Sequence, residues 1–138
     1  GMDEEAVETH LRATDYGVLA LARDGEAYAI PVAYHYDDEG RVLLRLGVTA
    51  DSEKVAFLET TDRATLVVEG TDGTDRWSVI ARGPVRRLPD EEAAALDAAD
   101  VNERFAPFRV FDEAVEDIEY ELFALDPDAV TGRHTMEG

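Results

Sequence analysis

The residues best suited to chemistry lie in residues 42–58, where a predicted strand leads through a glycine turn into a predicted helix. Thr49 and Ser52 place hydroxyl groups at the expected start of that helix, and Lys54, the only lysine of the chain, follows directly. The first N–H groups of a helix have no partner within it and, with the helix dipole, attract anions. Arg45 adds a second cation. It interrupts an otherwise apolar strand, and an arginine in such a place usually has an anionic partner. The pattern therefore predicts an anion site suited to a phosphate group.

A purely structural interpretation fits the same residues. Ser52 then caps the helix, Lys54 lies in solvent, and Arg45 pairs with one of the 32 acidic residues. Short patterns of hydroxyl residues and lysine also arise by chance. The residues alone leave both interpretations open.

The composition narrows the classes of function. The chain has 138 residues and a net charge of −19, and twelve of its thirteen basic residues are arginine. Such a charge repels nucleic acids and anionic membranes, which argues against both as partners. Replacement of lysine by arginine on an acidic surface is typical of salt-loving organisms, where salt screens the repulsion. We therefore expect a halophilic protein.

Several other features of the sequence limit the class of protein to which the chain can belong. There is no cysteine, so disulfides and thiolate chemistry are excluded, and the three histidines show no metal-binding spacing. No segment has the length of a membrane span or the pattern of a signal peptide, so we expect a cytoplasmic protein. Gly1 is interpreted as an expression-tag remnant. Residues 2–138 are predicted to form one domain, because no linker, repeat or low-complexity segment interrupts them.

The order of predicted elements indicates a mainly β (α+β) fold. Turn signals recur about every ten residues between runs of alternating or apolar character. The pattern predicts a six-stranded antiparallel split β-barrel with peripheral helices. The predicted strands are residues 17–22, 27–36, 41–46, 63–69, 76–88 and 120–125, with a possible short edge strand after them, and the predicted helices are residues 3–13, 52–60 and 90–105.

The strand at 27–36 has one large and one small face. Tyrosines and branched residues alternate with Ala29, Pro31, Ala33 and His35. Pro31 cannot donate to a ladder, so the strand should be an edge, a bulge or locally open. The small face either lets a flat ligand approach the backbone or packs against another element. For Trp77, on a later strand, the residue type favours core packing.

Four stretches in the right order carry a resemblance to a known family. They are G-V-L-A-L-A (17–22), A-I-P-V-A-Y-H-Y-D (29–37), L-R-L-G-V-T-A-D-S-E-K-V-A-F-L (44–58) and W-S-V-I-A-R-G-P-V (77–85). Together they resemble the flavin-binding split barrels related to pyridoxamine 5′-phosphate oxidase. The resemblance is good over residues 8–88 and loose in the C-terminal third, where it rests on L-F-A-L and T-G-R.

The resemblance implies a homodimer with FMN in the groove between two chains. The strand around Pro31 would run beside the isoalloxazine ring, and the residues around Lys54 would hold the phosphate. Trp77 and Ser78 would approach from a later strand, from the same or the other subunit. The cofactor-binding residues implied in this way are Ile30, Pro31, Val32, Ala33, Arg45, Val48, Thr49, Ser52, Lys54, Trp77 and Ser78.

Two departures from the family pattern limit what the resemblance implies. The residue before Lys54 is the acid Glu53, whereas the family often has a second basic residue there. The substrate-binding arginine and histidine of the true oxidases find only a faint counterpart in Gly132-Arg133-His134. Vitamin B6 oxidation is therefore not the expected reaction.

The function predicted from the sequence is a flavin-dependent oxidoreductase acting on an unidentified small substrate. No side chain is clearly a catalytic acid or base, and His35 is the best candidate. Two alternatives stay open: the same barrel binding a deazaflavin or haem, and a flavin-binding or sensor protein without turnover. No glycine-rich dinucleotide motif is present, so a nicotinamide would bind only transiently.

Overall fold

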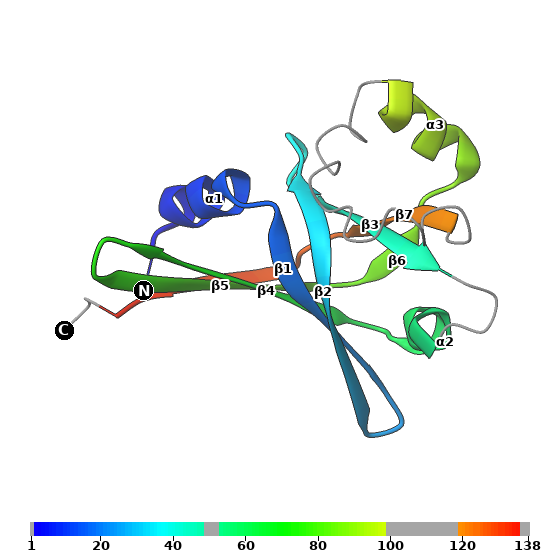
Figure 1. The fold of residues 1–138 in the computed structure, drawn as a ribbon, viewed down its shortest axis with the longest axis horizontal. Helices are drawn as coiled ribbons and strands as arrows, with labels where there is room; N and C mark the ends of the chain where they lie inside the picture. The colour runs from blue at the N-terminus through cyan, green and yellow to red at the C-terminus, as the bar shows by residue number, and fades with distance from the viewer. Residues whose placement is uncertain (1, 49–52, 99–118, 136–138) are drawn as a thin grey trace, which may run out of the picture.

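The computed structural model describes residues 2–48, 53–98 and 119–135, and within these residues one antiparallel sheet forms most of the molecule (Figure 1). The strand order is β6-β7-β3-β2-β1-β4-β5-β8. The elements in chain order are α1 (Glu4–Ala13), β1 (Tyr16–Arg23), β2 (Glu26–Tyr36), β3 (Val42–Val48), α2 (Glu53–Thr60), β4 (Ala64–Asp72), β5 (Asp75–Gly83), β6 (Val85–Arg87), α3 (Asp90–Ala98), β7 (Glu119–Leu125) and β8 (Ala129–His134).

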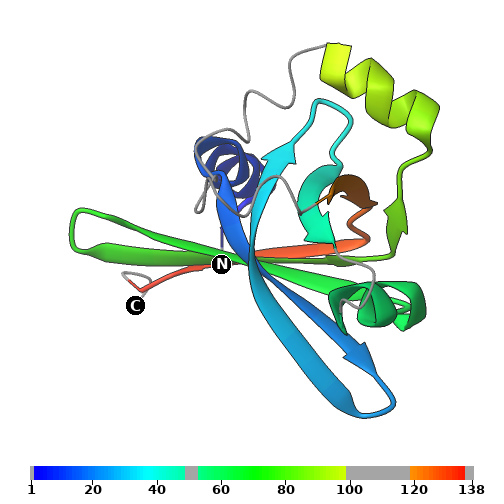
Figure 2. The ribbon, with the colours of Figure 1, turned by 45° about the vertical axis from the view of Figure 1, so that its right-hand side comes forward.

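The β1–β2 hairpin sets the register of the sheet. Its turn, Asp24-Gly25, has positive φ at both residues, 49° and 84°, as a two-residue turn that follows the strand twist requires. Arg23 pairs with Glu26, and the pairing continues to Tyr16 opposite Ala33. Figure 2 shows this hairpin projecting from the sheet on one side, as the β4–β5 hairpin does on another.

The two ends of the strand order meet, so the sheet curls on itself. β5 and β6 are one bent strand that breaks at Gly83-Pro84, and it pairs first with β8 and then with β7. At the bend, the Asp126 N–H donates to the Pro84 carbonyl at 3.0 Å, and the Asp128 N–H donates to the Arg82 carbonyl at 2.8 Å. The result is a split barrel with helices at its periphery, as the sequence predicts.

The core occupies the inner face of this curled sheet. The alternation of each strand sends one set of side chains inward. The inward-facing set includes Leu19, Val32, Leu44, Leu66 and Val79, all almost completely buried. α1 closes one side with Val7 and Leu11, and α2 adds Phe57 and Leu58. A smaller cluster on the outer face joins Ala33, Leu43, Leu88, Leu122 and Ala124.

The strand count is eight in the described residues, whereas six were predicted. The predicted strand 76–88 divides into β5 and β6, because a Cβ at Gly83 would collide with the Asp126 carbonyl and Pro84 has no N–H to donate. The possible edge strand near the C-terminus is a full partner of β5. Both differences arise where distant segments meet.

The predicted helices correspond to α1, α2 and α3. α3 is described as far as Ala98, so the rest of the predicted helix 90–105 lies outside the described residues. Among the described helices, none has the length and apolar character needed to cross a membrane.

Candidate functional site

The outer face of β2 carries the small residues singled out in the sequence. Ala29 and Pro31 are exposed there, His35 is half-buried, and Ala33 is buried in the smaller apolar cluster. The large residues Ile30, Val32 and Tyr34 face the core instead. A planar group approaching the outer face would therefore meet small side chains and backbone along half of this strand.

β2 is also open along part of its edge toward β3. Pairing with β3 begins only at Ala33 opposite Arg45 and runs to Tyr36. Counted from the turn, Pro31 opposite Val18 occupies a non-hydrogen-bonded position of the β1–β2 ladder, so the missing N–H would face the open side. Pro31 thus breaks no ladder bond, and the strand is locally open, as predicted.

Arg45 occupies the next position along this outer face. It lies on β3 between Ala33 on β2 and Leu122 on β7, and its side chain is half-buried. Its neighbours Leu44 and Leu46 point into the core, which explains why the arginine interrupts an apolar run. The guanidinium group is therefore held beside the small-residue face.

Lys54 is brought to the same end of β3 from the first turn of α2. Its Nζ donates a 2.7 Å hydrogen bond to the Gly47 carbonyl, and Gly47 is two residues from Arg45 on the same strand. Burial lowers the pKa of Lys54 below its ordinary 10.5. The lysine is thus held in place and partly desolvated, which strengthens its attraction for an anion.

Only some of the other residues predicted to contact the phosphate lie among the described residues. Val48 is the last residue of β3, where it pairs with Glu119. Thr49 and Ser52 lie outside the described residues. Of the predicted set, the structure therefore places Arg45 opposite Ala33 and anchors Lys54 to Gly47, two residues from Arg45 on β3.

Trp77 and Ser78 lie on opposite faces of β5. The Trp77 side chain is only 7% exposed, packs against Gly70 and stacks on His10 of α1 at 4.1 Å. Within one chain its ring therefore belongs to the core, as its residue type indicated, and not to the face that bears Pro31. Ser78 is half-buried on the outer face, opposite Glu69 and Arg133.

Two residues that the sequence reasoning did not select stand out on β1. Tyr16 and Val18 are 48% and 43% exposed and share the outer face with Pro31 and Ala33. The available signal was that residues 17–22 are apolar throughout, because a strand that is apolar on both faces is usually covered on both. The described chain covers only the inner one.

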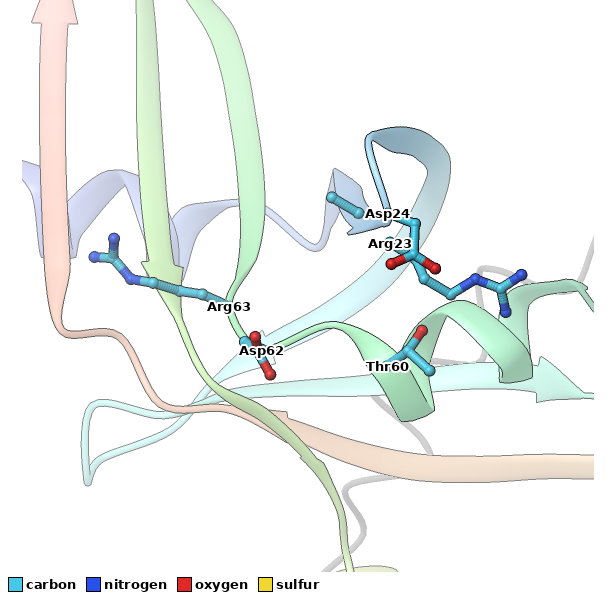
Figure 3. Close-up of a pocket in the computed structure, with 6 residues that line it drawn as sticks. Arg23, Asp24, Thr60, Asp62 and Arg63 are labelled. Atoms are coloured by element: carbon cyan, nitrogen blue, oxygen red, sulfur yellow. The ribbon is translucent and has the colours of Figure 1, made fainter.

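A cavity of about 470 Å³ opens between the β1–β2 hairpin, the end of α2 and the start of β4 (Figure 3). None of the predicted cofactor-binding residues lines it. Figure 3 shows the guanidinium groups of Arg23 and Arg63 pointing in opposite directions. Arg63 pairs with Asp128, and Arg23 lies over the Phe57 ring. The polar groups of this cavity therefore do not converge on one point.

A family model described as pyridoxamine 5′-phosphate oxidase matches residues 3–134. The chain belongs to this family. The match extends the resemblance seen in the sequence through the C-terminal third, including β7 and β8. No match was found among curated proteins.

Several solved structures have the same fold as this member of the pyridoxamine 5′-phosphate oxidase family. An FAD-binding protein from Mesorhizobium loti is 21% identical, with a TM-score of 0.77 over 97% of this chain and 96% of that one. An FAD-binding protein from Mycobacterium smegmatis is 18% identical, with a TM-score of 0.68 over 96% and 95%. The flavocytochrome Anf3 from Azotobacter vinelandii is 16% identical, with a TM-score of 0.67 over 95% and 66%.

In this member of the family, Gly132-Arg133-His134 does not present a joint substrate site. The three residues lie in the edge strand β8, where Arg133 faces outward and His134 faces the opposite side. The His134 Nδ1 lies 2.7 Å from Asp75 Oδ2, so the imidazole is oriented by a carboxylate. The two side chains therefore do not act on one substrate group within this chain.

Proposed function

We propose that this protein is a homodimeric, FMN-dependent oxidoreductase that acts on a small organic substrate in the cytoplasm of a salt-loving organism. The carrying observation is that Lys54 is hydrogen-bonded to the Gly47 carbonyl of β3, two residues along that strand from Arg45, whose partner Ala33 lies on the small outer face of β2. Family membership and three structural relatives whose names include a flavin or flavocytochrome support a flavin as the ligand.

The residues present fit the phosphate end of such a ligand. Lys54 and Arg45 supply two cations, and the half-buried position of each keeps their charges poorly screened by water. Thr49 and Ser52 are proposed to complete the site with hydroxyl groups, and Val48 with its backbone. Lys54 would exchange its bond to the Gly47 carbonyl for one to phosphate.

The small face of β2 fits the ring of the flavin. Ala29, Pro31 and Ala33 leave the backbone accessible, and Ile30 and Val32 would contribute main-chain atoms only. Exposed Tyr16 and Val18 on the neighbouring strand support a second copy of the chain as the cover of this face. In that arrangement Ser78, and not the buried Trp77 ring, would offer a side chain from β5.

The bound flavin would supply the hydride or electron chemistry, and the protein would supply binding and orientation. The described side chains near Pro31 are mostly small or apolar, which excludes water from a ring lying there. His35 lies on the same face, half-buried opposite Leu43, and is the nearest candidate for moving a proton.

The first test is a visible absorption spectrum of the purified protein in molar salt, before and after addition of FMN. Binding of FMN should give the two bands of oxidised flavin, eluting with the protein. Lys54→Ala should weaken FMN binding by about 1–3 kcal/mol, because a charge-assisted hydrogen bond to phosphate is lost. Titration of each variant by flavin fluorescence measures this change.

Two further variants serve as controls. Lys54→Arg keeps the charge and should retain most of the affinity, whereas Arg12→Gln removes a cation on α1, away from β3, and should leave it unchanged. Equal FMN affinity in the wild type and Lys54→Ala would rule out this placement of the phosphate. Oxidation of NADH or NADPH in the presence of candidate acceptors then separates an enzyme from a non-catalytic flavin-binding protein.

A second candidate ligand is FAD, because two of the structural relatives are FAD-binding proteins. Chromatography of the flavin released by denaturation distinguishes FMN from FAD. If the protein binds neither flavin, a deazaflavin and haem are the next ligands to test in the same barrel. Each of them has its own absorption spectrum.

A further inference from the structure

Lys54 carries the only side-chain amine of this protein, because the other twelve residues of the lysine and arginine type are all arginine. A guanidinium group keeps its proton at every physiological pH, whereas a lysine amine can lose its proton and then act as a nucleophile. Reagents that acylate lysine therefore have a single target among the side chains. What such a reaction would change depends on where Lys54 lies.

The Lys54 amine is held in a defined place near the end of β3. Its Nζ donates to the Gly47 carbonyl at 2.7 Å, and its side chain is half-buried. Burial removes water from the amine and lowers the pKa of Lys54 below its ordinary 10.5. A larger fraction of this amine is thus neutral near pH 7 than of a lysine in open solvent. The neutral amine keeps N–H groups for the bond to Gly47, so its lone pair is available for attack.

The charges near Lys54 favour a reagent that is an anion. Arg45 lies on the same face of β3 as Gly47, two residues away, which is about 7 Å along the strand. The nearest carboxylate in the sequence, that of Glu53, belongs to an exposed side chain, so water and salt screen it better than they screen the half-buried Arg45. An anionic acyl donor is therefore attracted to the amine in a way that a neutral donor is not.

We propose that Lys54 is a modification site that is acylated by small acyl phosphates. The neutral Nζ attacks the carbonyl carbon of the acyl phosphate, and the bond from that carbon to the phosphate oxygen breaks. Phosphate leaves with the electron pair, the amine gives one proton to water, and an amide replaces the ammonium group. The reaction oxidises and reduces nothing.

Acylation removes a positive charge from the place where the phosphate of the flavin is proposed to bind. Acylated protein should therefore bind FMN more weakly, in the same way that acetylation of a lysine removes an ion-pair donor elsewhere. This consequence rests on the proposed function, whereas the acylation itself does not. The modification would let the supply of acyl phosphate regulate how much of the protein carries flavin.

The test compares two lysines in one molecule. Arg82→Lys adds a second lysine on β5, at a position that is exposed and forms none of the ion pairs among the described side chains. The flavin-free variant is treated with acetyl phosphate at one fixed salt concentration, and mass spectrometry of its peptides follows acetylation at both positions. Lys54 should react at least about threefold faster than the introduced lysine, because its amine is less hydrated and lies near Arg45.

A neutral donor separates the attraction of the anion from the reactivity of the amine. With the N-hydroxysuccinimide ester of acetic acid, the preference for Lys54 should be smaller. Arg45→Gln should slow acetylation of Lys54 by acetyl phosphate at least about threefold and should change the reaction with the ester by less than about twofold. Glu53→Gln should speed the reaction with acetyl phosphate.

Two results would overturn the proposal. One is acetylation of Lys54 by acetyl phosphate that is no faster than that of the introduced lysine, and the other is an equal effect of Arg45→Gln on both donors. A separate titration measures the consequence for the flavin. Acetylated protein should bind FMN at least about fivefold more weakly than untreated protein, whereas the same treatment should leave the affinity of Lys54→Arg unchanged. If Lys54 is acetylated selectively but FMN affinity stays the same, or FMN does not bind at all, the acylation site stands and the proposed phosphate contact is wrong.

Discussion

At the scale of single residues, Tyr34 shows how one buried phenol fixes a helix to the sheet. Its hydroxyl group donates to the Leu11 carbonyl at 2.8 Å and lies 2.9 Å from Thr14 Oγ1, at the end of α1. The Thr14 hydroxyl in turn donates to the His10 carbonyl at 2.5 Å. Tyr34 and Thr14 therefore each satisfy one of the backbone carbonyls that a helix end leaves without partners.

Ionisation of the Tyr34 phenol also makes the free energy of unfolding fall at alkaline pH. Burial raises the pKa of Tyr34 to about 12, against 10.0 when exposed. Since the folded pKa is higher, the unfolded chain releases its proton first, and stability is lost as pH rises from 10 to 12. Urea unfolding should show a loss of about 2–3 kcal/mol from this residue over that window.

Tyr34→Phe should cost about 1–2 kcal/mol below pH 10 and should make the alkaline loss smaller than in the wild type. Tyr28→Phe is the matched control, because Tyr28 stacks on Phe57 and its hydroxyl forms no hydrogen bond within the described residues. An alkaline dependence that is the same in Tyr34→Phe and the wild type would contradict the assignment.

At the scale of elements, three arginines of the barrel contact described acidic side chains of α3. Arg41 donates to Glu92 of α3 and to Asp37 of the β2–β3 turn, each at 2.8 Å. Arg86 on β6 lies 3.6 Å from the same Glu92, and Arg87 approaches Asp90. Ala93 is the described α3 residue that packs on the outer cluster. Among the described side chains, ion pairs therefore make most of the contacts between this helix and the barrel.

Glu92→Gln should speed hydrogen exchange of the α3 amides, because Arg41 and Arg86 lose their shared partner. The Arg41 guanidinium lowers the pKa of Glu92 below its ordinary value, so the protection factors of the α3 amides in the wild type should fall as pH falls through that lowered value. In molar salt, hydrogen exchange of the α3 amides in the wild type should become closer to that in the variant. Glu91→Gln, in the same helical turn, should change nothing, and equal exchange in both variants would contradict the role of Glu92.

Local sequence patterns were enough to predict most elements, but they did not predict how distant segments meet. Alternation located β2, and the recurring turn signals located the connections between the strands. The Gly83-Pro84 pair is a local signal for a bend in residues 76–88, but it does not reveal that the bend closes on Asp126, more than 40 residues away.

Only part of the candidate site was predicted, for a similar reason. Arg45 and Lys54 were found because their residue types are unusual in their surroundings. The exposed pair Tyr16 and Val18 was missed, because an apolar strand does not itself reveal which of its faces the chain leaves uncovered.

At the scale of the whole molecule, closure of the barrel depends on two glycines with different neighbours. A Cβ at Gly83 would collide with the backbone carbonyl of Asp126, which cannot move without breaking the closure. A Cβ at Gly132 would meet the Met2 Sδ at 2.7 Å, the end of a flexible side chain.

Gly83→Ala should therefore destabilise the protein by about 3 kcal/mol or more, and Gly132→Ala by about 1 kcal/mol. Urea unfolding followed by fluorescence of Trp77, the sole tryptophan, measures both. The pair is well matched, because the same atoms are added on the inner face of the same sheet. Similar losses in the two variants would show that closure at Asp126 is not the sensitive point.

The charge of the whole chain sets the conditions under which the proposed homodimer forms. Two chains of net charge −19 repel each other, and salt reduces this repulsion by screening. The outer face around Tyr16, Val18 and Pro31 carries no charged residue at these positions, so two copies that meet there bring few charges into contact. Association should therefore strengthen with salt.

Val18→Asp should convert the dimer to a monomer, because it places a charge at the centre of this uncharged face. Thr9→Asp adds the same charge on the exposed side of α1 and should leave the dimer intact. Sedimentation equilibrium over a range of salt concentrations measures association, and circular dichroism checks that both variants are folded. A wild type that stays monomeric at every salt concentration would exclude the homodimer. A monomeric Val18→Asp that binds FMN with unchanged affinity would instead place the whole flavin site within one chain.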